Sequence, residues 1–376
     1  MRGGLRELKP GVWEVRAEAG RDPVSGRRRQ VSRTVRGTKR EAQKKLNALV
    51  ADLDQGNQVG SDATFADVAE RWLNLSGADL SPTTLRRYSQ LLRSHILPAI
   101  GTQSAHKVRT SDLDDLYQGL IATKGLAPAT VRQVHSVIRR AMSQAVRWGW
   151  ITTNPAANTT PPRVTKPTIK PPDVEKVIEL LQLAHEVYPE FGRFLHLAVT
   201  TGARRGELCA LKWERIDFDN ATLTISRAMV EVQGGLVEKD TKTHSIRRIA
   251  LDEQTLVVLT EHRAQAERLA AEAGCTVTGD SYVFTLDPAG AVPFTPDHAT
   301  KTFQRLRQKV GLDNTRLHDL RHFAATSLLA AGVPVRTVSG RLGHANAATT
   351  LGVYAHFVEA SDKIAADALG RILRLI

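Results

Sequence analysis

The spacing of hydrophobic residues changes along the chain, from short strand-like runs to long helical stripes. Residues 5–19 and 27–36 hold β-branched and aromatic residues on either side of a turn region with Gly and Pro, which predicts two short strands. Thr38 followed by Glu41 matches a capping box and predicts the start of a helix. The first part of the chain is therefore expected to form a small sheet with one helix.

The spacing becomes helical from Thr64, which is expected to cap a helix together with an aspartate three residues later. Ser81 followed by Pro82 predicts a second helix, because proline at the first helical position loses no hydrogen bond. Apolar stripes over 113–121 and 131–146 predict a third and a fourth helix. Together these segments predict an all-α helical bundle.

Residues 154–172 hold six prolines, so they cannot continue as a helix and form the clearest linker of the chain. After the linker we expect two helices up to Thr201, three short strands over 213–251, and then further helices. The expected fold class is multi-domain: a small β-sheet-plus-helix N-terminal domain, an all-α bundle, and a mixed, mainly-α domain with a small antiparallel sheet. The expected domains cover residues 1–56, 62–160 and 171–376.

Charge separates these regions. The chain holds 52 Lys and Arg against 39 Asp and Glu, a formal net charge of +13. Residues 1–60 carry 14 basic and 7 acidic residues, residues 61–170 carry the same numbers, and residues 171–376 carry 24 and 25. An excess confined to the first 170 residues favours two DNA-contacting modules over a solubilising basic face. The near-neutral remainder is the expected place for chemistry.

Several classes of protein are disfavoured. Two cysteines, Cys209 and Cys275, are too few for a disulfide scaffold or a thiolate metal site. No apolar run approaches the roughly 18 residues of a membrane helix, and the first residues lack the apolar segment of a signal peptide. We therefore expect a soluble, cytoplasmic protein of a reducing compartment with no membrane partner.

Candidate chemistry concentrates in the last region. Arginine, tyrosine, lysine and histidine side chains together can transfer a phosphoryl group without a metal ion. The arginine guanidinium groups bind the non-bridging phosphate oxygens, and a tyrosine phenol holds the phosphate covalently. Lysine or histidine transfers the protons. His318 and Arg321 are three positions apart and share a predicted helix face, and Lys242 lies on the turn before the third strand. The candidate residues are Arg204, Lys242, His318, Arg321, His344 and Tyr354.

Each candidate has a simpler alternative. Arg205 could act in place of Arg204, although adjacent helical residues point roughly 100° apart. His318 and His322 have a zinc-ligand spacing, but an aspartate follows the first histidine where the zincin motif has glutamate. We therefore expect neither a metal nor another cofactor. Lone tyrosines are usually packing residues, so Tyr354 stands out only by its place after the last histidine motif.

The candidate residues lie in five short motifs: Thr-Gly-Ala-Arg-Arg-Gly-Glu-Leu at 201–208, Thr-Lys-Thr at 241–243, His-Asp-Leu-Arg-His at 318–322, Leu-Gly-His at 342–344, and Tyr354 before Ala-His. In this order and spacing the motifs resemble the tyrosine recombinase family, particularly phage-type integrases with an N-terminal arm-binding domain. The resemblance implies that residues 1–56 bind arm-type DNA sites, that residues 62–160 bind core sites, and that residues 171–376 form the catalytic domain with a C-terminal docking tail.

The resemblance also implies roles for the residues. Arg204 and Arg321 would clamp the scissile phosphate, and Tyr354 would form a 3′-phosphotyrosine link. The resemblance assigns Lys242 as general acid, His318 as general base or acid, His344 as a phosphate hydrogen-bond donor, and Glu207 as the residue that orients Arg204. Expected DNA contacts are Arg27, Arg28, Arg29, Arg86, Arg87, Arg139 and Arg140.

The implied function is a site-specific DNA recombinase that integrates, and excises, a mobile element such as a phage genome. Its expected partners are core and arm attachment sites in double-stranded DNA, three further copies of the chain in a homotetramer, a host DNA-bending protein and an excision directionality factor. It would act on the bacterial nucleoid. The alternatives are a non-cutting DNA-binding regulator on the same fold and a chromosome-dimer resolvase, which would leave residues 1–56 unused.

Overall fold

The computed structural model describes residues 3–21, 28–54, 63–77, 79–165, 171–232, 234–241, 246–343, 367 and 369–371. The chain divides into two compact units, Met1–Lys166 and Pro167–Ile376. Within the first unit, the N-terminal sheet and the helical bundle have separate hydrophobic cores. Each region can therefore be described by its own core.

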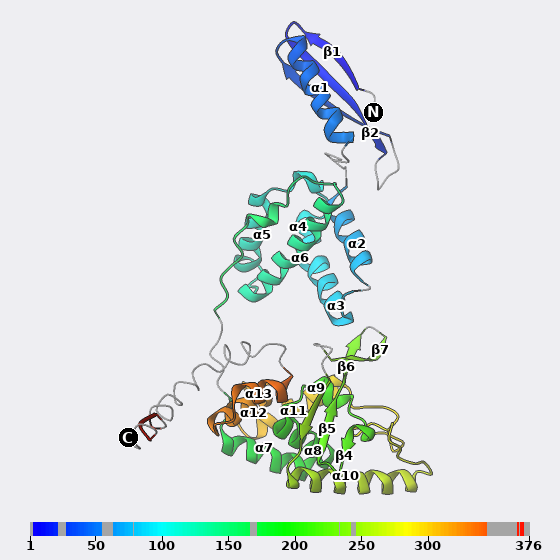
Figure 1. Ribbon diagram of the computed structural model, residues 1–376, viewed down its shortest axis with the longest axis vertical. Helices are drawn as coiled ribbons and strands as arrows, with labels where there is room; N and C mark the ends of the chain where they lie inside the picture. The colour runs from blue at the N-terminus through cyan, green and yellow to red at the C-terminus, as the bar shows by residue number, and fades with distance from the viewer. Residues whose placement is uncertain are drawn as a thin grey trace. The chain divides into compact units, whose positions relative to one another are not determined.

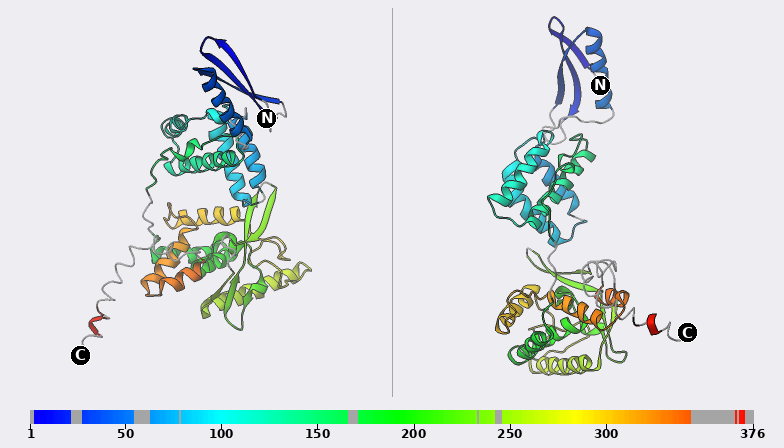
Figure 2. Two further views of the ribbon diagram at one scale, coloured as in Figure 1. Left: turned by 45° about the horizontal axis from the view of Figure 1, so that its top comes forward. Right: turned by 90° about the vertical axis from the view of Figure 1, so that its left-hand side faces the viewer.

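The N-terminal region is a three-stranded antiparallel sheet with helix α1 packed on one face (Figures 1 and 2). As predicted, Thr38 and Glu41 cap the helix: the Thr38 N–H donates to Glu41 Oε2 over 2.8 Å. The single strand expected over 5–19 is wrong, because Pro10 and Gly11 form a turn in which Gly11 has a φ of 74°. The elements are β1 (Gly3–Lys9), β2 (Val12–Arg21), β3 (Arg28–Arg36) and α1 (Lys39–Asp54).

The helical bundle surrounds α6, whose apolar face is fully buried. The predicted caps are confirmed, because Thr64 and Asp67 bond reciprocally and Ser81 Oγ accepts from the Thr84 N–H. Beyond α3 the chain forms a π-helical turn ahead of Pro98, which has no N–H to donate to the helix. The helices are α2 (Phe65–Ser76), α3 (Pro82–Leu91), the π-turn Leu92–Ile96, α4 (Leu97–Ile100), α5 (Thr110–Ala122) and α6 (Pro128–Arg147).

The second unit packs its helices around α8, which contacts α7, α9, α10 and α12. Phe194 of α8 is fully buried, stacked on Phe191 and edge-on to Phe284. The helices predicted after residue 171 are confirmed as far as residue 343. They are α7 (Val174–Val187), α8 (Pro189–Thr201), α9 (Arg205–Cys209), α10 (Glu253–Glu272), α11 (Pro296–Lys309), α12 (Asp319–Ala330) and α13 (Val335–Leu342).

The strands of this unit differ from the prediction of three over 213–251. The described residues form five short strands in two sheets, β4–β5–β8 and the hairpin β6–β7. The prediction had breaks at residues 219–220 and 234–235, which separate β4 from β5 and β6 from β7. It had no break between β5 and β6 or between β7 and β8, so it gave two strands too few. The strands are β4 (Ile216–Asp217), β5 (Thr222–Ile225), β6 (Arg227–Val232), β7 (Gly235–Asp240) and β8 (Arg247–Ala250).

No helix in the described part of the chain is long and apolar enough to cross a bilayer.

Candidate active site

A left-handed turn between α8 and α9 places the first candidate arginine. Gly202 ends α8 with a φ of 64°, a conformation that favours glycine. A Cβ at this position would also lie 2.5 Å from Leu342 Cδ2 of α13. The turn brings α13 close and leaves Arg204 as the N-cap residue of α9.

Arg204 and Arg205 point in different directions. Arg204 donates from Nη1 to Glu207 Oε1 over 2.9 Å and from Nη2 to the Gly343 carbonyl over 3.3 Å. Its side chain is 27% exposed, so N–H donors of the guanidinium still face solvent. Arg205 is exposed and donates to the Thr300 hydroxyl of α11. Of the two, only Arg204 therefore bonds to the end of α13, whereas Arg205 bonds to α11.

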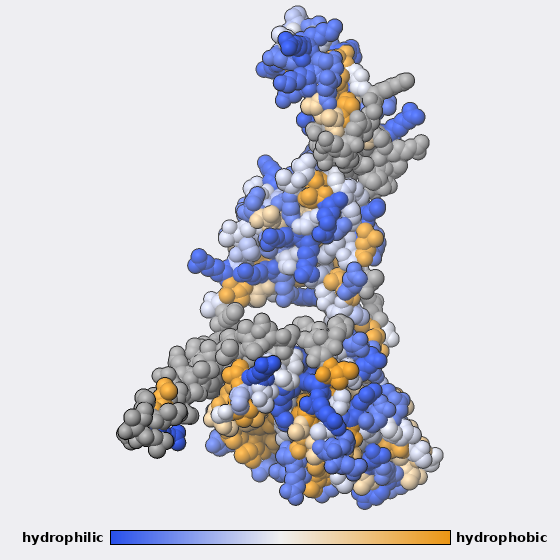
Figure 3. All heavy atoms as spheres, viewed as in Figure 1, coloured by the Kyte–Doolittle hydropathy of each residue, from blue (hydrophilic) through white to orange (hydrophobic). Residues whose placement is uncertain are grey.

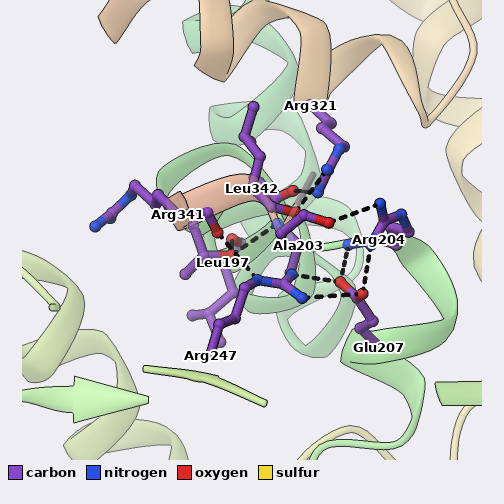
Figure 4. Close-up of polar contacts among 11 residues, drawn as sticks. Leu197, Ala203, Arg204, Glu207, Arg247, Arg321, Arg341 and Leu342 are labelled. Atoms are coloured by element: carbon purple, nitrogen blue, oxygen red, sulfur yellow. Dashed lines mark hydrogen bonds and ion pairs between the residues drawn. The ribbon is translucent and has the colours of Figure 1, made fainter. Parts of the chain in front are cut away.

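Arg321 of α12 approaches the same backbone segment from another helix. It is 3% exposed and donates from Nη1 to the Gly202 carbonyl over 2.7 Å and from Nη2 to the Leu342 carbonyl over 2.6 Å. The two candidate arginines therefore bond to the consecutive carbonyls of Leu342 and Gly343 (Figure 4). Two guanidinium groups, far apart in sequence, are held in fixed orientations at the end of α13.

A buried carboxylate stands behind Arg204. Glu207 is 2% exposed; its Oε2 accepts from the Arg204 backbone N–H over 2.8 Å, in addition to the bond from the Arg204 guanidinium. Burial alone would raise the pKa of Glu207, but hydrogen bonds and charge from Arg247, with the contacts from Arg204, lower it below its usual value. Glu207 is therefore ionised at neutral pH, and its two oxygens hold the backbone N–H and the guanidinium of Arg204.

The other partner of Glu207, Arg247 of β8, was not among the predicted site residues. It is 7% exposed and bonds to both carboxylate oxygens of Glu207. Nothing in the local composition separates it from its neighbour Arg248. The available signal was the alternation of the strand, which places Arg247 on the same face as the buried Ile249 and leaves Arg248 exposed.

His318 precedes α12 and lies beside His322, with ring centroids 5.1 Å apart and edge to face. Although His318 is exposed, desolvation by the protein around its ring and the positive charges of His322 and Arg321 lower its pKa to about 4. The imidazole is therefore neutral near pH 7 and can accept a proton. Among the described residues, no group of three His, Cys, Asp or Glu side chains is arranged to hold a metal ion.

Three predicted site residues, Lys242, His344 and Tyr354, lie outside the described residues. The structure describes the chain on both sides of Lys242, up to Thr241 and again from Ile246. It also describes the backbone up to Gly343, directly before His344.

Two of the arginines predicted to contact DNA, both on the helical bundle, line a basic hollow. Arg139 and Arg140 are exposed on α6, and together with Arg147 and Trp72 they line a hollow of about 460 Å³. Arg140 also donates to the Tyr88 hydroxyl over 2.6 Å. Hydrophilic side chains cover much of the bundle face seen in Figure 3. The arginine-lined hollow has the charge and the polarity to contact a phosphate backbone.

The remaining predicted contacts are scattered. Arg86 is exposed on α3, and Arg87 is half-buried and donates to Gln133 on α6 over 3.0 Å. Arg28 is exposed at the start of β3. Arg27 and the side chain of Arg29 lie outside the description. Neither Arg86 nor Arg87 lines the hollow of the bundle.

Two preorganised guanidinium groups beside a neutral histidine, on a mainly helical unit, define a site of the kind that binds a phosphodiester under attack. Residues 173–360 match the model of the phage integrase family, and residues 65–161 match the phage integrase central domain. The chain therefore belongs to the phage integrase family, and it is a site-specific tyrosine recombinase of the kind that integrates mobile elements.

Individual relatives match over most of their length. The ICEBs1 integrase of Bacillus subtilis is 25% identical over 374 residues, which cover 98% of this chain and 100% of that protein. The structure of the Tn1549 transposon integrase in complex with a circular intermediate DNA matches with a TM-score of 0.68 at 21% identity, over 81% of this chain and 99% of that chain. A lambda integrase tetramer bound to a Holliday junction matches with a TM-score of 0.60 at 18% identity, over 91% of this chain and 95% of that chain.

Proposed function

We propose that this recombinase cuts and rejoins DNA through Tyr354, with Arg204 and Arg321 as the clamp on the scissile phosphate. The observation that carries the proposal is the convergence of the two guanidinium groups on the carbonyls of Leu342 and Gly343. A phosphodiester under attack gains negative charge on its non-bridging oxygens. Guanidinium groups already fixed in place stabilise that charge without reorganising during the reaction.

The chemistry balances without a redox partner. The phenolic oxygen of Tyr354 attacks phosphorus, a new P–O bond forms to the tyrosine, and the bond from phosphorus to the 5′ oxygen breaks. Lys242 delivers a proton to the departing 5′ oxygen, and His344 donates a hydrogen bond to the phosphate. The products are a 3′-phosphotyrosine and a 5′ hydroxyl. The hydroxyl of a partner strand then reverses the step and rejoins the DNA.

His318 is suited to take the phenolic proton. Its lowered pKa keeps the ring neutral at physiological pH before DNA binds. A bound phosphate is an opposite charge, which raises the pKa of a nearby imidazole and strengthens it as a base. Its position directly before Asp319 and close to Arg321 places the ring at the same end of α12 as the clamp.

The other regions supply DNA binding in this proposal. Residues 62–160 grip core sites through the basic hollow of the bundle, and residues 1–56 bind arm-type sites. Support for using both regions comes from the basic excess before residue 170 and from the ICEBs1 integrase, which matches this chain over nearly its whole length. Four protomers would assemble on two DNA duplexes, as the lambda tetramer does on a Holliday junction. A host DNA-bending protein and an excision directionality factor would control direction on the bacterial nucleoid.

The test is covalent trapping on a nicked DNA substrate carrying the native attachment core, with EDTA present. Wild type should give a denaturant-resistant adduct on the 3′ phosphate, Tyr354→Phe should give none, and both should bind the DNA equally. Tyr188→Phe is the matched control, since Tyr188 is an exposed tyrosine between α7 and α8 and should leave the adduct unchanged.

Two results would overturn the proposal. An adduct with Tyr354→Phe would mean that another residue is the nucleophile. Tight binding without any adduct from wild type would favour the non-cutting regulator. Deleting residues 1–56 separates the integrase from the resolvase. Both should keep core cleavage, but only an integrase should lose recombination between its attachment sites.

A further inference from the structure

Arg247 connects three segments of the active site, although no predicted role involves it. Its Nη1 and Nη2 donate to the two oxygens of Glu207, over 3.1 and 2.6 Å. Its Nε donates to the Arg341 carbonyl, in the last turn of α13, over 3.0 Å. One buried guanidinium therefore links β8, the start of α9 and the end of α13 (Figure 4).

The hydrogen bonds from Arg247 to Glu207 help to hold Arg204 in place, because Glu207 also binds Arg204. Glu207 is buried, and a buried carboxylate is stable only when its oxygens are paired and hydrogen-bonded. Arg204 and Arg247 share that role, each with one bond to each oxygen of the carboxylate. Without Arg247, the carboxylate would keep only the contacts from Arg204 and would favour its protonated form, which holds a guanidinium less firmly.

The hydrogen bond from Arg247 to the Arg341 carbonyl holds the end of α13, where Gly343 follows. Gly343 ends α13 with a φ of 68°, and a Cβ there would lie 2.9 Å from Nη1 of Arg247. The backbone at Gly343 therefore packs directly on the Arg247 guanidinium. The Gly343 carbonyl accepts from Arg204, so Arg247 supports both ends of that hydrogen bond.

We infer that Arg247 is a positioning residue of the strand-cleavage reaction: through Glu207 and the end of α13 it holds Arg204 in the orientation that binds the scissile phosphate. The inference rests on the proposed function, because it assumes that Arg204 contacts the phosphate. Arg247 itself does not touch the DNA. Its loss should slow the chemical step and leave DNA affinity nearly unchanged.

The neighbouring residue is a matched control. Arg248 lies on the opposite face of β8, is exposed, and donates to Thr222 and Asp217 over 2.8 Å each. Arg248→Met removes one positive charge from β8, as Arg247→Met does. The hydrogen bonds that it removes go to Thr222 and Asp217 and not to Glu207 or α13. A general effect of charge or of β8 stability would appear in both variants, whereas positioning of Arg204 would be lost only in Arg247→Met.

The experiment measures single-turnover cleavage at saturating DNA for wild type, Arg247→Met, Arg247→Lys, Arg248→Met, Arg204→Ala and the double variant Arg204→Ala with Arg247→Met. Folding is checked by thermal unfolding and DNA affinity by titration. Arg247→Met should cleave about 100-fold more slowly than wild type, and the double variant should be within about threefold of Arg204→Ala, because residues that act as one unit are not additive. Arg248→Met should match wild type.

A neutral substrate adds a readout that a purely structural role would not move. Methylphosphonate at the scissile position removes the charge that Arg204 stabilises, so the difference between wild type and Arg247→Met should shrink on this substrate. If Arg247→Met does not fold, Arg247→Lys carries the test: it keeps the charge but not the fork, and it should still be at least about tenfold slow.

The outcomes separate the two claims. If wild type forms no adduct, the proposed function fails and this inference fails with it. If wild type cleaves and the folded Arg247 variants match it, the inference alone is overturned. Rate losses that multiply in the double variant, or an undiminished loss on the methylphosphonate, would also overturn it, because Arg247 would then act independently of Arg204.

Discussion

Arginine occupies two contrasting environments in this chain. On the helical bundle, Arg139 and Arg140 are exposed beside a basic hollow, in a region with an excess of positive charge. In the second unit, which has almost no net charge, Arg247 and Arg321 are buried and bonded to a carboxylate or to backbone carbonyls. The same side chain is a solvated charge in one region and a fixed part of the framework in the other.

The difference indicates a division of labour. Exposed arginines bind the phosphate backbone of any sequence, and the counterions bound to those phosphates are released. The affinity that they contribute therefore falls as the salt concentration rises. Buried arginines have already lost their water, and their protein acceptors fix where the remaining donors point. Such groups contribute to the rate at one phosphate rather than to affinity along the duplex.

The largest expected effect is on the buried side of this comparison. Arg321→Lys keeps the charge but cannot reach the Gly202 and Leu342 carbonyls with one rigid fork. We expect single-turnover cleavage to fall about 1,000-fold while DNA affinity changes less than about threefold. A rate within tenfold of wild type would show that the fork geometry is not needed.

A smaller loss is expected from the glycine that ends α13. Gly343→Ala forces a side chain into a left-handed backbone conformation and against Arg247, and it should slow cleavage about 30-fold at unchanged affinity. Gly340→Ala is the control within the same helix, because a Cβ there meets no atom within 4 Å. Equal rates for the two variants would contradict the close packing at Gly343.

Substitutions of the exposed arginines on the bundle should change the affinity for DNA rather than the cleavage rate. Arg139→Gln combined with Arg140→Gln should raise the Kd about tenfold and lower the salt dependence of binding by about two phosphate contacts. The cleavage rate at saturating DNA should stay within twofold. Arg215→Gln, at an exposed arginine of the second unit, is the control. An unchanged salt slope would remove the bundle hollow from the DNA interface.

The smallest effect concerns protonation at the site. His318 should titrate with a pKa near 4 in free protein, followed by NMR of the ring, rather than near its ordinary 6.5. Since the folded-state pKa is lowered, this group's contribution to stability is full above about pH 6.5 and is lost as pH falls toward 4. Arg321→Met should raise the His318 pKa slightly. A wild-type midpoint near 6.5 would contradict the influence of the site on this ring.

Local features of the fold could be predicted from the sequence, because they depend on neighbours. The caps at Thr38, Thr64 and Ser81 need only residues three positions away, and all three are confirmed. Strand pairing is not local. Strand β5 pairs with β4 on one edge and with β8 on the other, about 25 residues further along the chain, and short strands of this kind leave little pattern to detect.

The candidate site divides in the same way. Motif spacing was enough to nominate Arg204, Glu207 and Arg321, since the resemblance is carried by short segments. It did not nominate Arg247, because its role depends on contacts with α9 and α13 that only the folded unit brings together. Strand alternation could have separated it from Arg248, but only once β8 had been assigned.

The division of labour is tested most directly by measuring two quantities on the same nicked substrate for two variants. These are the salt dependence of DNA binding and the single-turnover cleavage rate at saturation, for Arg321→Lys and for the paired Arg139→Gln and Arg140→Gln substitutions. We expect opposite patterns: Arg321→Lys loses rate and keeps the wild-type salt slope, whereas the paired variant loses slope and keeps rate. If both variants lose rate and slope together, the two groups of arginines do not have separate roles in DNA binding and cleavage.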